Sequence, residues 1–121
     1  MNKFFQGFKY AFNGWILLFK SELNAKVHLF ASVISFGLSI FLQLNYIEWA
    51  LVILCVFGVL AAEGMNTAIE ILANRISKER DDEIKKAKDV AAGAVLFASL
   101  AAAAIGCILF LPKIILLIQD V

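Results

Sequence analysis

The chain has 121 residues, which is the size of a single domain. Hydrophobic residues make up 62% and charged residues 17%, a composition too apolar for a soluble domain of this length. The formal net charge of +1 gives no indication of nucleic acid or of an acidic partner. Long stretches carry no charge, and the charges that remain are concentrated near the N-terminus and in residues 75–89. The sequence therefore predicts an all-α integral membrane protein.

Residues 1–22 are expected to form an amphipathic surface helix. Aromatic side chains recur at steps of three and four, which places them on one helical face: Phe5, Phe8, Phe12, Trp15 and Phe19. Lysines and other polar residues lie on the remaining faces. A helix of this kind suits the membrane interface and lies in the membrane plane instead of crossing it. The alternative is that the aromatic stripe packs on protein, and the two interpretations are compatible.

Three transmembrane helices are predicted to follow, at about 27–45, 48–72 and 90–111. The uncharged part of the second one, residues 49–62, spans about 21 Å at a rise of about 1.5 Å per residue. This is less than the hydrocarbon core of roughly 30 Å, so the helix has to continue beyond Glu63 and bring it to the level of the headgroups. Pro112 is expected to end or kink the last helix, and the apolar tail after it is expected to lie at the interface.

The distribution of Lys and Arg predicts the orientation of the chain. Of the 11 such residues, all except Lys113 lie before the first span or between the second and third spans. The positive-inside rule then places the N-terminus and the loop at 75–88 in the cytoplasm, and the C-terminus on the outer side.

Polar side chains interrupt the second span on one face. Glu63, Asn66 and Glu70 are spaced by three and four residues, so the two carboxylates lie only about 20° apart around the helix. Ionisable groups inside a membrane are costly and usually face the bundle interior or a water-filled cavity. In the alternative interpretation, Asn66 joins two helices by a hydrogen bond and Glu70 is an ordinary boundary carboxylate. Three polar groups on one stripe favour a functional site.

More charged residues are expected at the same depth. Glu22 lies just before the first span, and Lys88 and Asp89 lie just before the third. Mg²⁺ prefers one or two carboxylates together with water and substrate phosphates, and a lysine is a suitable point charge for a phosphate. This cluster predicts a site for a magnesium nucleotide at the cytoplasmic surface, with a lipid group reaching Glu63 from the membrane. The alternative is a non-enzymatic membrane protein or a carrier with proton sites, although a proton path needs no phosphate-binding lysine.

Segments along nearly the whole chain resemble the prokaryotic diacylglycerol kinase family, which includes the undecaprenol kinases. They read FKYAFNGW, SELNAKVHL, EGMNTAIEIL and KAKDVAAGAVL. The resemblance implies a homotrimer of three-span subunits in the bacterial inner membrane, each with an N-terminal surface helix, and active sites shared between neighbouring subunits. It also implies an ATP- and Mg²⁺-dependent kinase that phosphorylates the hydroxyl of a membrane lipid alcohol.

The resemblance further implies roles for individual residues. Glu63 matches the family's proposed general base, and Asn66 matches the amide of the same motif. Glu22 and Glu70 match the carboxylates that hold magnesium. The positions that match nucleotide contacts are Lys3, Tyr10, Glu22, Glu70, Glu79, Asp81, Lys88 and Asp89. Asn74 departs from the family pattern, which often has aspartate there.

The lipid substrate has two candidates, undecaprenol and diacylglycerol. In SELNAKVHL a lysine stands two residues before His28, and this pattern looks more like the undecaprenol-kinase branch. Undecaprenol is therefore the favoured substrate, with a diacylglycerol kinase that makes phosphatidic acid as the alternative. For His28 itself the sequence leaves open a contact with the substrate or an ordinary polar role at the membrane boundary.

Overall fold

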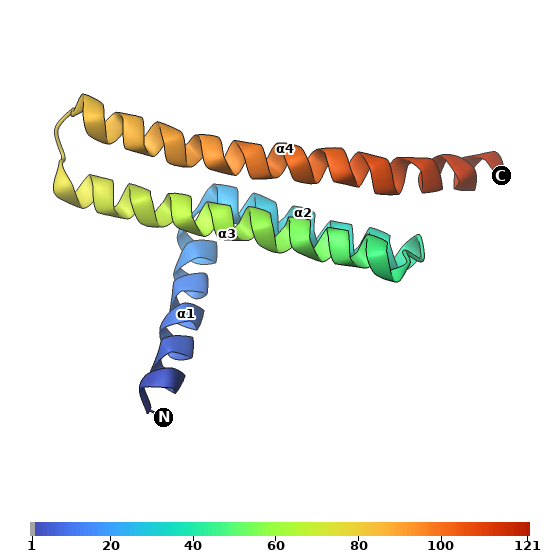
Figure 1. The fold of residues 1–121 in the computed structure, drawn as a ribbon, viewed down its shortest axis with the longest axis horizontal. Helices are drawn as coiled ribbons and strands as arrows, with labels where there is room; N and C mark the ends of the chain where they lie inside the picture. Colours follow the sequence, from blue (N-terminus) through green and yellow to red (C-terminus); the bar gives the residue numbers. More distant parts are fainter. Residues whose placement is uncertain (1) are drawn as a thin grey trace.

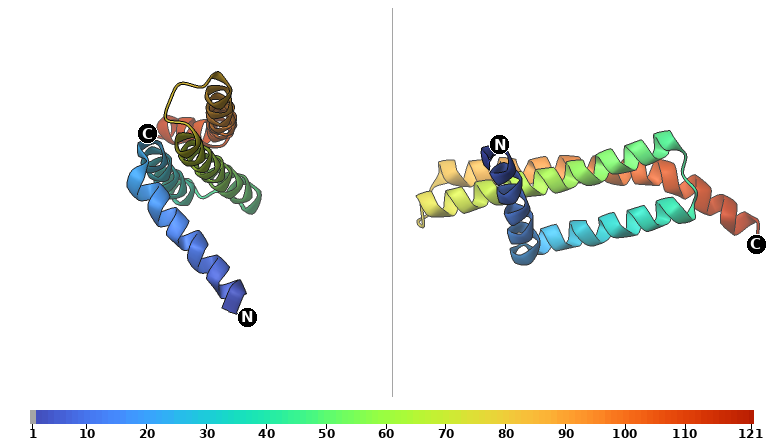
Figure 2. Two further views of the ribbon diagram at one scale, coloured as in Figure 1. Left: turned by 90° about the vertical axis from the view of Figure 1, so that its left-hand side faces the viewer. Right: turned by 90° about the horizontal axis from the view of Figure 1, so that it is seen from below.

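The computed structural model describes residues 2–121, and this part of the chain forms four α-helices: α1 (Asn2–Ser21), α2 (Leu23–Phe41), α3 (Tyr46–Ile76) and α4 (Asp82–Gln119). Helices α2, α3 and α4 run alongside one another in alternating directions, and α1 projects sideways from the start of α2 (Figures 1 and 2). Each of the three bundled helices is long and apolar enough to cross a membrane. The predicted all-helical architecture with three candidate spans is confirmed.

The helices continue beyond the spans expected from the sequence. Helix α2 begins at Leu23 instead of near residue 27, α3 continues to Ile76, and α4 begins at Asp82. Pro112 lies inside α4, so it does not end that helix. A proline removes one backbone donor, but a helix packed against its neighbours can tolerate this loss. Which parts of the helices lie in hydrocarbon stays a prediction.

The turn between α2 and α3 is held by a capping box. The side chain of Asn45 accepts a hydrogen bond from the backbone N–H of Glu48 at 2.9 Å, and a carboxylate oxygen of Glu48 accepts one from the backbone N–H of Asn45 at 3.1 Å. Two of the donors left free at the start of α3 are satisfied in this way. Lys113 of α4 lies 3.3 Å from the same Glu48 carboxylate, so this corner also joins α4 to α3.

Helix α3 is central, because α2 and α4 both pack on it and make little contact with each other. A small buried cluster lies next to the α2–α3 turn and consists of Leu44, Val52, Val56 and Leu109. Beside it the rings of Phe36 and Trp49 stack with centroids 6.2 Å apart. Most other large apolar side chains are exposed, including the aromatic stripe of α1 except Phe19, which is half-buried. A single chain therefore exposes a large apolar surface, which lipid or another protein chain has to cover.

Candidate active site

Glu63 is the buried charged side chain of the bundle. Its residue is only 2% exposed, and Asn66 and Thr67 of the following turn are buried beside it. The end of α1 closes on the same part of α3: Leu18 is buried, and its side chain would meet a Cβ added at Gly64 at 3.7 Å. The junction of α1 and α2 is thereby held next to the polar stripe of α3.

The carboxylate of Glu63 faces a histidine from the neighbouring helix. The Nε2 atom of His28, on α2, lies 3.5 Å from the Oε2 atom of Glu63, and the His28 side chain is 23% exposed. This pair was not predicted from the sequence. The available signal was a single histidine in an otherwise uncharged helix, and nothing in the sequence indicates which residue of α3 it meets.

Two further carboxylates approach Glu63. Glu22 and Glu70 both lie close enough for electrostatic repulsion with it. Glu70 is oriented from its own helix, because Asn66 Nδ2 donates a hydrogen bond to Glu70 Oε1 at 3.3 Å. Glu22 precedes α2 in extended backbone, and its side chain makes no capping hydrogen bond there. The structure thus brings Glu22, Glu63, Asn66 and Glu70 together, while their chemical roles stay predictions.

The donor set fits a magnesium ion only in part. No group of three or more His, Cys, Asp or Glu side chains in residues 2–121 is arranged to hold a metal ion. Glu22 and Glu70 supply hard carboxylate oxygens, and a Mg²⁺ ion with two such ligands takes its remaining ligands from water and substrate phosphates. The chemistry of these two side chains suits magnesium that arrives with a nucleotide, and a magnesium site formed by them stays a prediction.

Asn74 extends the polar stripe of α3 by one more turn beyond Glu70. Its Oδ1 atom accepts a hydrogen bond from the Nζ atom of Lys88 on α4 at 2.8 Å. This bond joins α4 to α3 near the connection between them. It holds the lysine ammonium near the end of the polar stripe that is farthest from Glu63. Asn74 therefore has a defined partner, which the sequence did not reveal.

A polar pocket of about 250 Å³ surrounds this connection, and its lining includes Asn74, Glu79, Arg80, Asp81, Lys85 and Lys88. Asp81 has a structural function here, because its side chain accepts hydrogen bonds from the first backbone N–H groups of α4 at 2.9 and 3.3 Å. Asp89 pairs with Lys85 of its own helix at 2.7 Å. The structure therefore gathers the loop candidates Glu79, Asp81 and Lys88 around one pocket, while the expected nucleotide contact of Asp89 stays a prediction.

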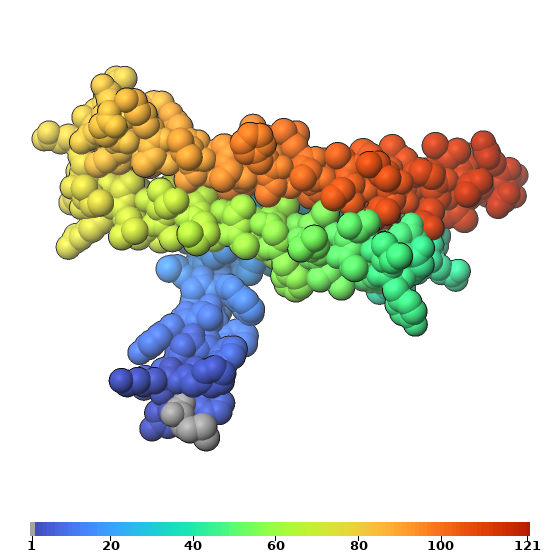
Figure 3. Space-filling view, in the orientation of Figure 1, coloured from blue at the N-terminus to red at the C-terminus, as the bar shows by residue number. Residues whose placement is uncertain are grey.

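Lys3 and Tyr10 are not brought to this site within one chain. Both are exposed on α1, which projects from the bundle as a separate limb (Figures 1 and 3). No contact in the described part of the chain links either side chain to the carboxylates of α3. Their predicted nucleotide contacts stay predictions.

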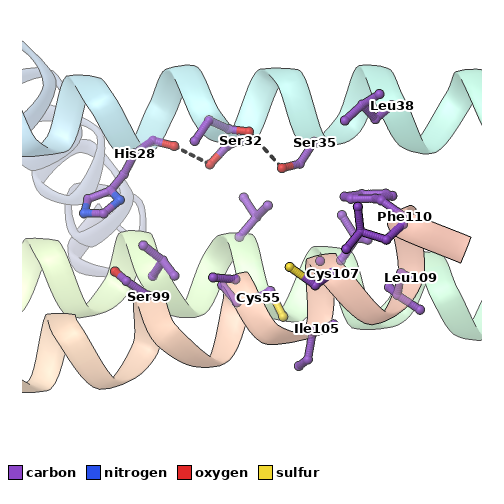
Figure 4. A pocket seen from close by; sticks show the side chains of 18 of the residues that line it. His28, Ser32, Ser35, Leu38, Cys55, Ser99, Ile105, Cys107, Leu109 and Phe110 are labelled. Atoms are coloured by element: carbon purple, nitrogen blue, oxygen red, sulfur yellow. Dashed lines mark hydrogen bonds between the residues drawn. The ribbon is translucent and has the colours of Figure 1, made fainter. Parts of the chain in front are cut away.

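An apolar groove of about 490 Å³ runs between α2, α3 and α4 (Figure 4). His28 and Ser99 lie at one end of it, and Leu38 and Phe110 lie at the other. The hydroxyls of Ser32 and Ser35 donate to carbonyls of their own helix at 2.7 and 2.8 Å, so they add little polarity to the groove. Since His28 also faces Glu63, the groove ends beside the buried carboxylate.

A family model described as prokaryotic diacylglycerol kinase matches residues 9–110. The chain belongs to the prokaryotic diacylglycerol kinase family. It is 33% identical to an undecaprenol kinase of Bacillus subtilis over 94% of this chain and 93% of that protein. It is also 35% identical to a diacylglycerol kinase of Synechocystis, over 89% of this chain and 62% of that protein. A diacylglycerol kinase of Haemophilus influenzae is 34% identical over 74% of this chain and 76% of its own length.

Membership in the prokaryotic diacylglycerol kinase family confirms the resemblance seen in the sequence. The matched region begins within α1 and ends within α4, so it includes the whole polar stripe and the lining of the groove except Leu111 and Ile114. The chain is therefore a member of a family of prokaryotic lipid kinases, and its three long apolar helices are those of a membrane protein.

Proposed function

We propose that this member of the prokaryotic diacylglycerol kinase family transfers the γ-phosphoryl group of ATP to the hydroxyl of a membrane lipid alcohol, with Mg²⁺ as cofactor. The observation that carries the proposal is the position of Glu63, a buried carboxylate 3.5 Å from His28, which lines the end of an apolar groove. Family membership argues against a non-enzymatic protein or a proton-coupled carrier, because the similar proteins are named as kinases.

The lipid is proposed to enter from the membrane along the groove. The hydrocarbon chain contacts apolar side chains there, and the hydroxyl reaches the end where His28 and Glu63 meet. A carboxylate at that point can accept the hydroxyl proton while the lipid oxygen attacks the γ-phosphorus of ATP. The bond from the γ-phosphorus to the bridging oxygen breaks, and ADP leaves.

The nucleotide is proposed to bind along the part of the polar stripe that is nearest the α3–α4 connection. Lys88 presents an ammonium group beside Asn74, and the pocket at the α3–α4 connection offers space for the polar parts of the nucleotide. Magnesium held by Glu22 and Glu70 would offset negative charge on the phosphates. The protein's own contribution is position and electrostatics, which is the usual basis of phosphoryl transfer.

Asn66 supports this arrangement from within α3. Its Nδ2 atom orients Glu70, and its Oδ1 atom is buried without a hydrogen-bond partner among the described residues. A buried acceptor without a partner is costly, so a group absent from the single chain is expected to satisfy it. The substrate hydroxyl and a neighbouring subunit are the two candidates.

The assembly is proposed to be a homotrimer with shared active sites in the bacterial inner membrane. Exposed apolar faces of the bundle support further protein contacts, and Ala91, Ala92, Gly93 and Ala94 of α4 allow close helix approach. Lys3 and Tyr10 lie on a limb that extends from its own bundle and can reach another subunit. The aromatic face of α1 is proposed to lie at the cytoplasmic interface, with the N-terminus inside and the C-terminus outside.

Undecaprenol is proposed as the preferred lipid, and diacylglycerol as the alternative. The similarity over 93% of an undecaprenol kinase supports this preference, although diacylglycerol kinases match at comparable identity. An apolar groove discriminates only modestly, by about 1–3 kcal/mol per methylene-sized difference, so activity on both lipids is expected.

The test is radiolabelled ATP with purified protein and both lipid alcohols in one mixed micelle, because a common micelle removes differences in detergent dilution. We expect both lipids to be phosphorylated, with the higher kcat/KM for undecaprenol. A preference of about tenfold for diacylglycerol, about 1.4 kcal/mol in transition-state binding, would reverse the substrate assignment. Phosphorylation of neither lipid at saturating Mg²⁺ and ATP would contradict the function.

A further inference from the structure

His28 lies where the groove meets the buried carboxylate, and the proposed reaction leaves it without a function. It belongs to α2, and its ring lines the end of the groove (Figure 4). Its Nε2 atom lies 3.5 Å from Glu63 Oε2. The other groups that act electrostatically on Glu63, the carboxylates of Glu22 and Glu70, repel it.

Glu63 needs an attractive partner because it is almost completely buried. A buried carboxylate without pairing is strongly unfavourable, and it would rotate toward water or become neutral. Among residues 2–121, His28 is the side chain that pairs with it. At 3.5 Å the contact is longer than a good hydrogen bond, so its geometry is that of a loose pair that a ligand can tighten.

The contact is also selective for one carboxylate oxygen. His28 approaches Oε2, so the Oε1 atom is left for a second partner. When a bound ligand tightens the contact at one oxygen, the carboxylate keeps a preferred orientation of the other, and small errors in orientation slow a transfer reaction.

We propose that His28 is a positioning residue for the proposed phosphorylation of the lipid alcohol: its Nε2 atom holds Oε2 of Glu63 and keeps Oε1 turned toward the hydroxyl that arrives along the groove. The inference rests on the proposed function. It means that His28, near the start of α2, affects the turnover of the lipid. The binding of nucleotide at the α3–α4 connection does not depend on His28.

The first test compares isosteric replacements at His28. The amide nitrogen of glutamine can occupy the place of Nε2, whereas that of asparagine lies nearer the backbone, at the place of Nδ1. We expect kcat on the lipid to fall by about tenfold to a hundredfold in His28→Ala and His28→Asn, with the KM for ATP unchanged. His28→Gln should recover a large part of kcat. A purely structural contribution would not distinguish the two amides in this way.

The matched control is Val33→Ala, an exposed apolar residue of the same helix outside the groove. It should leave both constants at the wild-type values. Size-exclusion chromatography and thermal unfolding in detergent establish that each variant assembles. If His28→Ala does not assemble, the comparison of the two amide variants decides alone, and equal kcat values for them would overturn the inference.

A double variant tests whether His28 acts through Glu63. Glu63→Asp shortens the carboxylate and withdraws it from the imidazole, so adding His28→Ala to it should cost little more than Glu63→Asp alone. If the fold-loss of kcat in the double variant equals the product of the two separate fold-losses, the inference is overturned, because His28 then acts independently of Glu63. The activity of the wild-type protein distinguishes failure of this inference from failure of the proposed function. If the wild type is active and His28→Ala is equally active, only the positioning function is contradicted. If the wild type is inactive, both proposals are contradicted.

Discussion

Lys88 and Asn74 connect α4 to α3 by a hydrogen bond from Nζ to Oδ1 at 2.8 Å. The bond lies at one end of the polar stripe of α3. The stripe begins with the buried Glu63 and passes through Asn66 and Glu70 to Asn74. A neutral amide holds the lysine in place without neutralising it. The ammonium group is therefore not paired with a carboxylate in this bond, as the proposed contact with a phosphate requires.

Replacing this amide by a carboxylate changes the competition for Lys88. In Asn74→Asp the lysine gains an ion pair that phosphate has to displace, so we expect the KM for ATP to rise. Exposed ion pairs are worth about 0–1 kcal/mol, so the expected increase is at most about fivefold. Asn74→Ala is the control, because it removes the partner without adding charge and should not raise the KM by that mechanism. A lower KM for ATP in Asn74→Asp would contradict this view of the pair.

The magnesium assignment predicts a shift in metal dependence. Glu22→Gln and Glu70→Gln each remove one charged oxygen ligand, so each variant should need more Mg²⁺ for half-maximal activity. Activity is measured in a magnesium titration at fixed ATP. Glu83→Gln is a useful comparison, because that exposed residue pairs with Lys86 on α4 and does not line the loop pocket. If neither Glu22→Gln nor Glu70→Gln shifts the titration, magnesium is bound elsewhere.

Shared active sites predict complementation between inactive subunits. Glu63→Gln removes the base and Lys88→Ala removes the phosphate partner, so a mixed trimer regains a complete site if these residues come from different chains. The two variants are unfolded, mixed and reassembled together, and turnover is compared with each variant reassembled alone. Turnover that stays at the level of the separate variants would mean that each subunit carries its own complete site.

The capping box predicts a loss of stability without a loss of site geometry. Asn45→Ala removes the acceptor for the backbone N–H of Glu48, and N-cap substitutions of this type cost about 0.5–2 kcal/mol. Asn45→Asp retains an acceptor and is the matched control. Thermal unfolding in detergent should show a lower midpoint for the alanine variant and a nearly unchanged midpoint for aspartate. Equal midpoints for the two variants would show that the cap contributes little.

The periodic features of single helices could be predicted from the sequence. The spacing of Glu63, Asn66 and Glu70 places them on one face of any α-helix, and the long uncharged stretches indicate membrane spans. The hydrogen bond between Asn66 and Glu70 follows from that spacing. Contacts between helices could not be predicted in this way, because the rotation of α2 and α4 about their axes is set by packing on α3. The pairs His28–Glu63 and Lys88–Asn74 are therefore found only in the structure.

Other differences have equally local causes. The sequence predicts that Pro112 ends or kinks the last span. Helix α4 passes through it, since the loss of one hydrogen bond does not outweigh the rest of a long helix, so the predicted end is wrong and the kink stays a prediction. Lys3 and Tyr10 were assigned to the site by resemblance alone, and no periodicity relates them to α3. Because both residues lie on the projecting α1, the sequence could not predict where they lie relative to the carboxylates of α3.

The most direct test of the account is the turnover of Glu63→Gln together with its affinity for ATP. The substitution keeps the size of the buried side chain and removes its ability to accept a proton, so it separates the base from the nucleotide site. We predict that phosphorylation of the lipid is abolished while ATP binding, measured by equilibrium titration in the presence of Mg²⁺, stays close to wild type. Near-normal turnover in an assembled Glu63→Gln protein would contradict the assignment of Glu63 as the base.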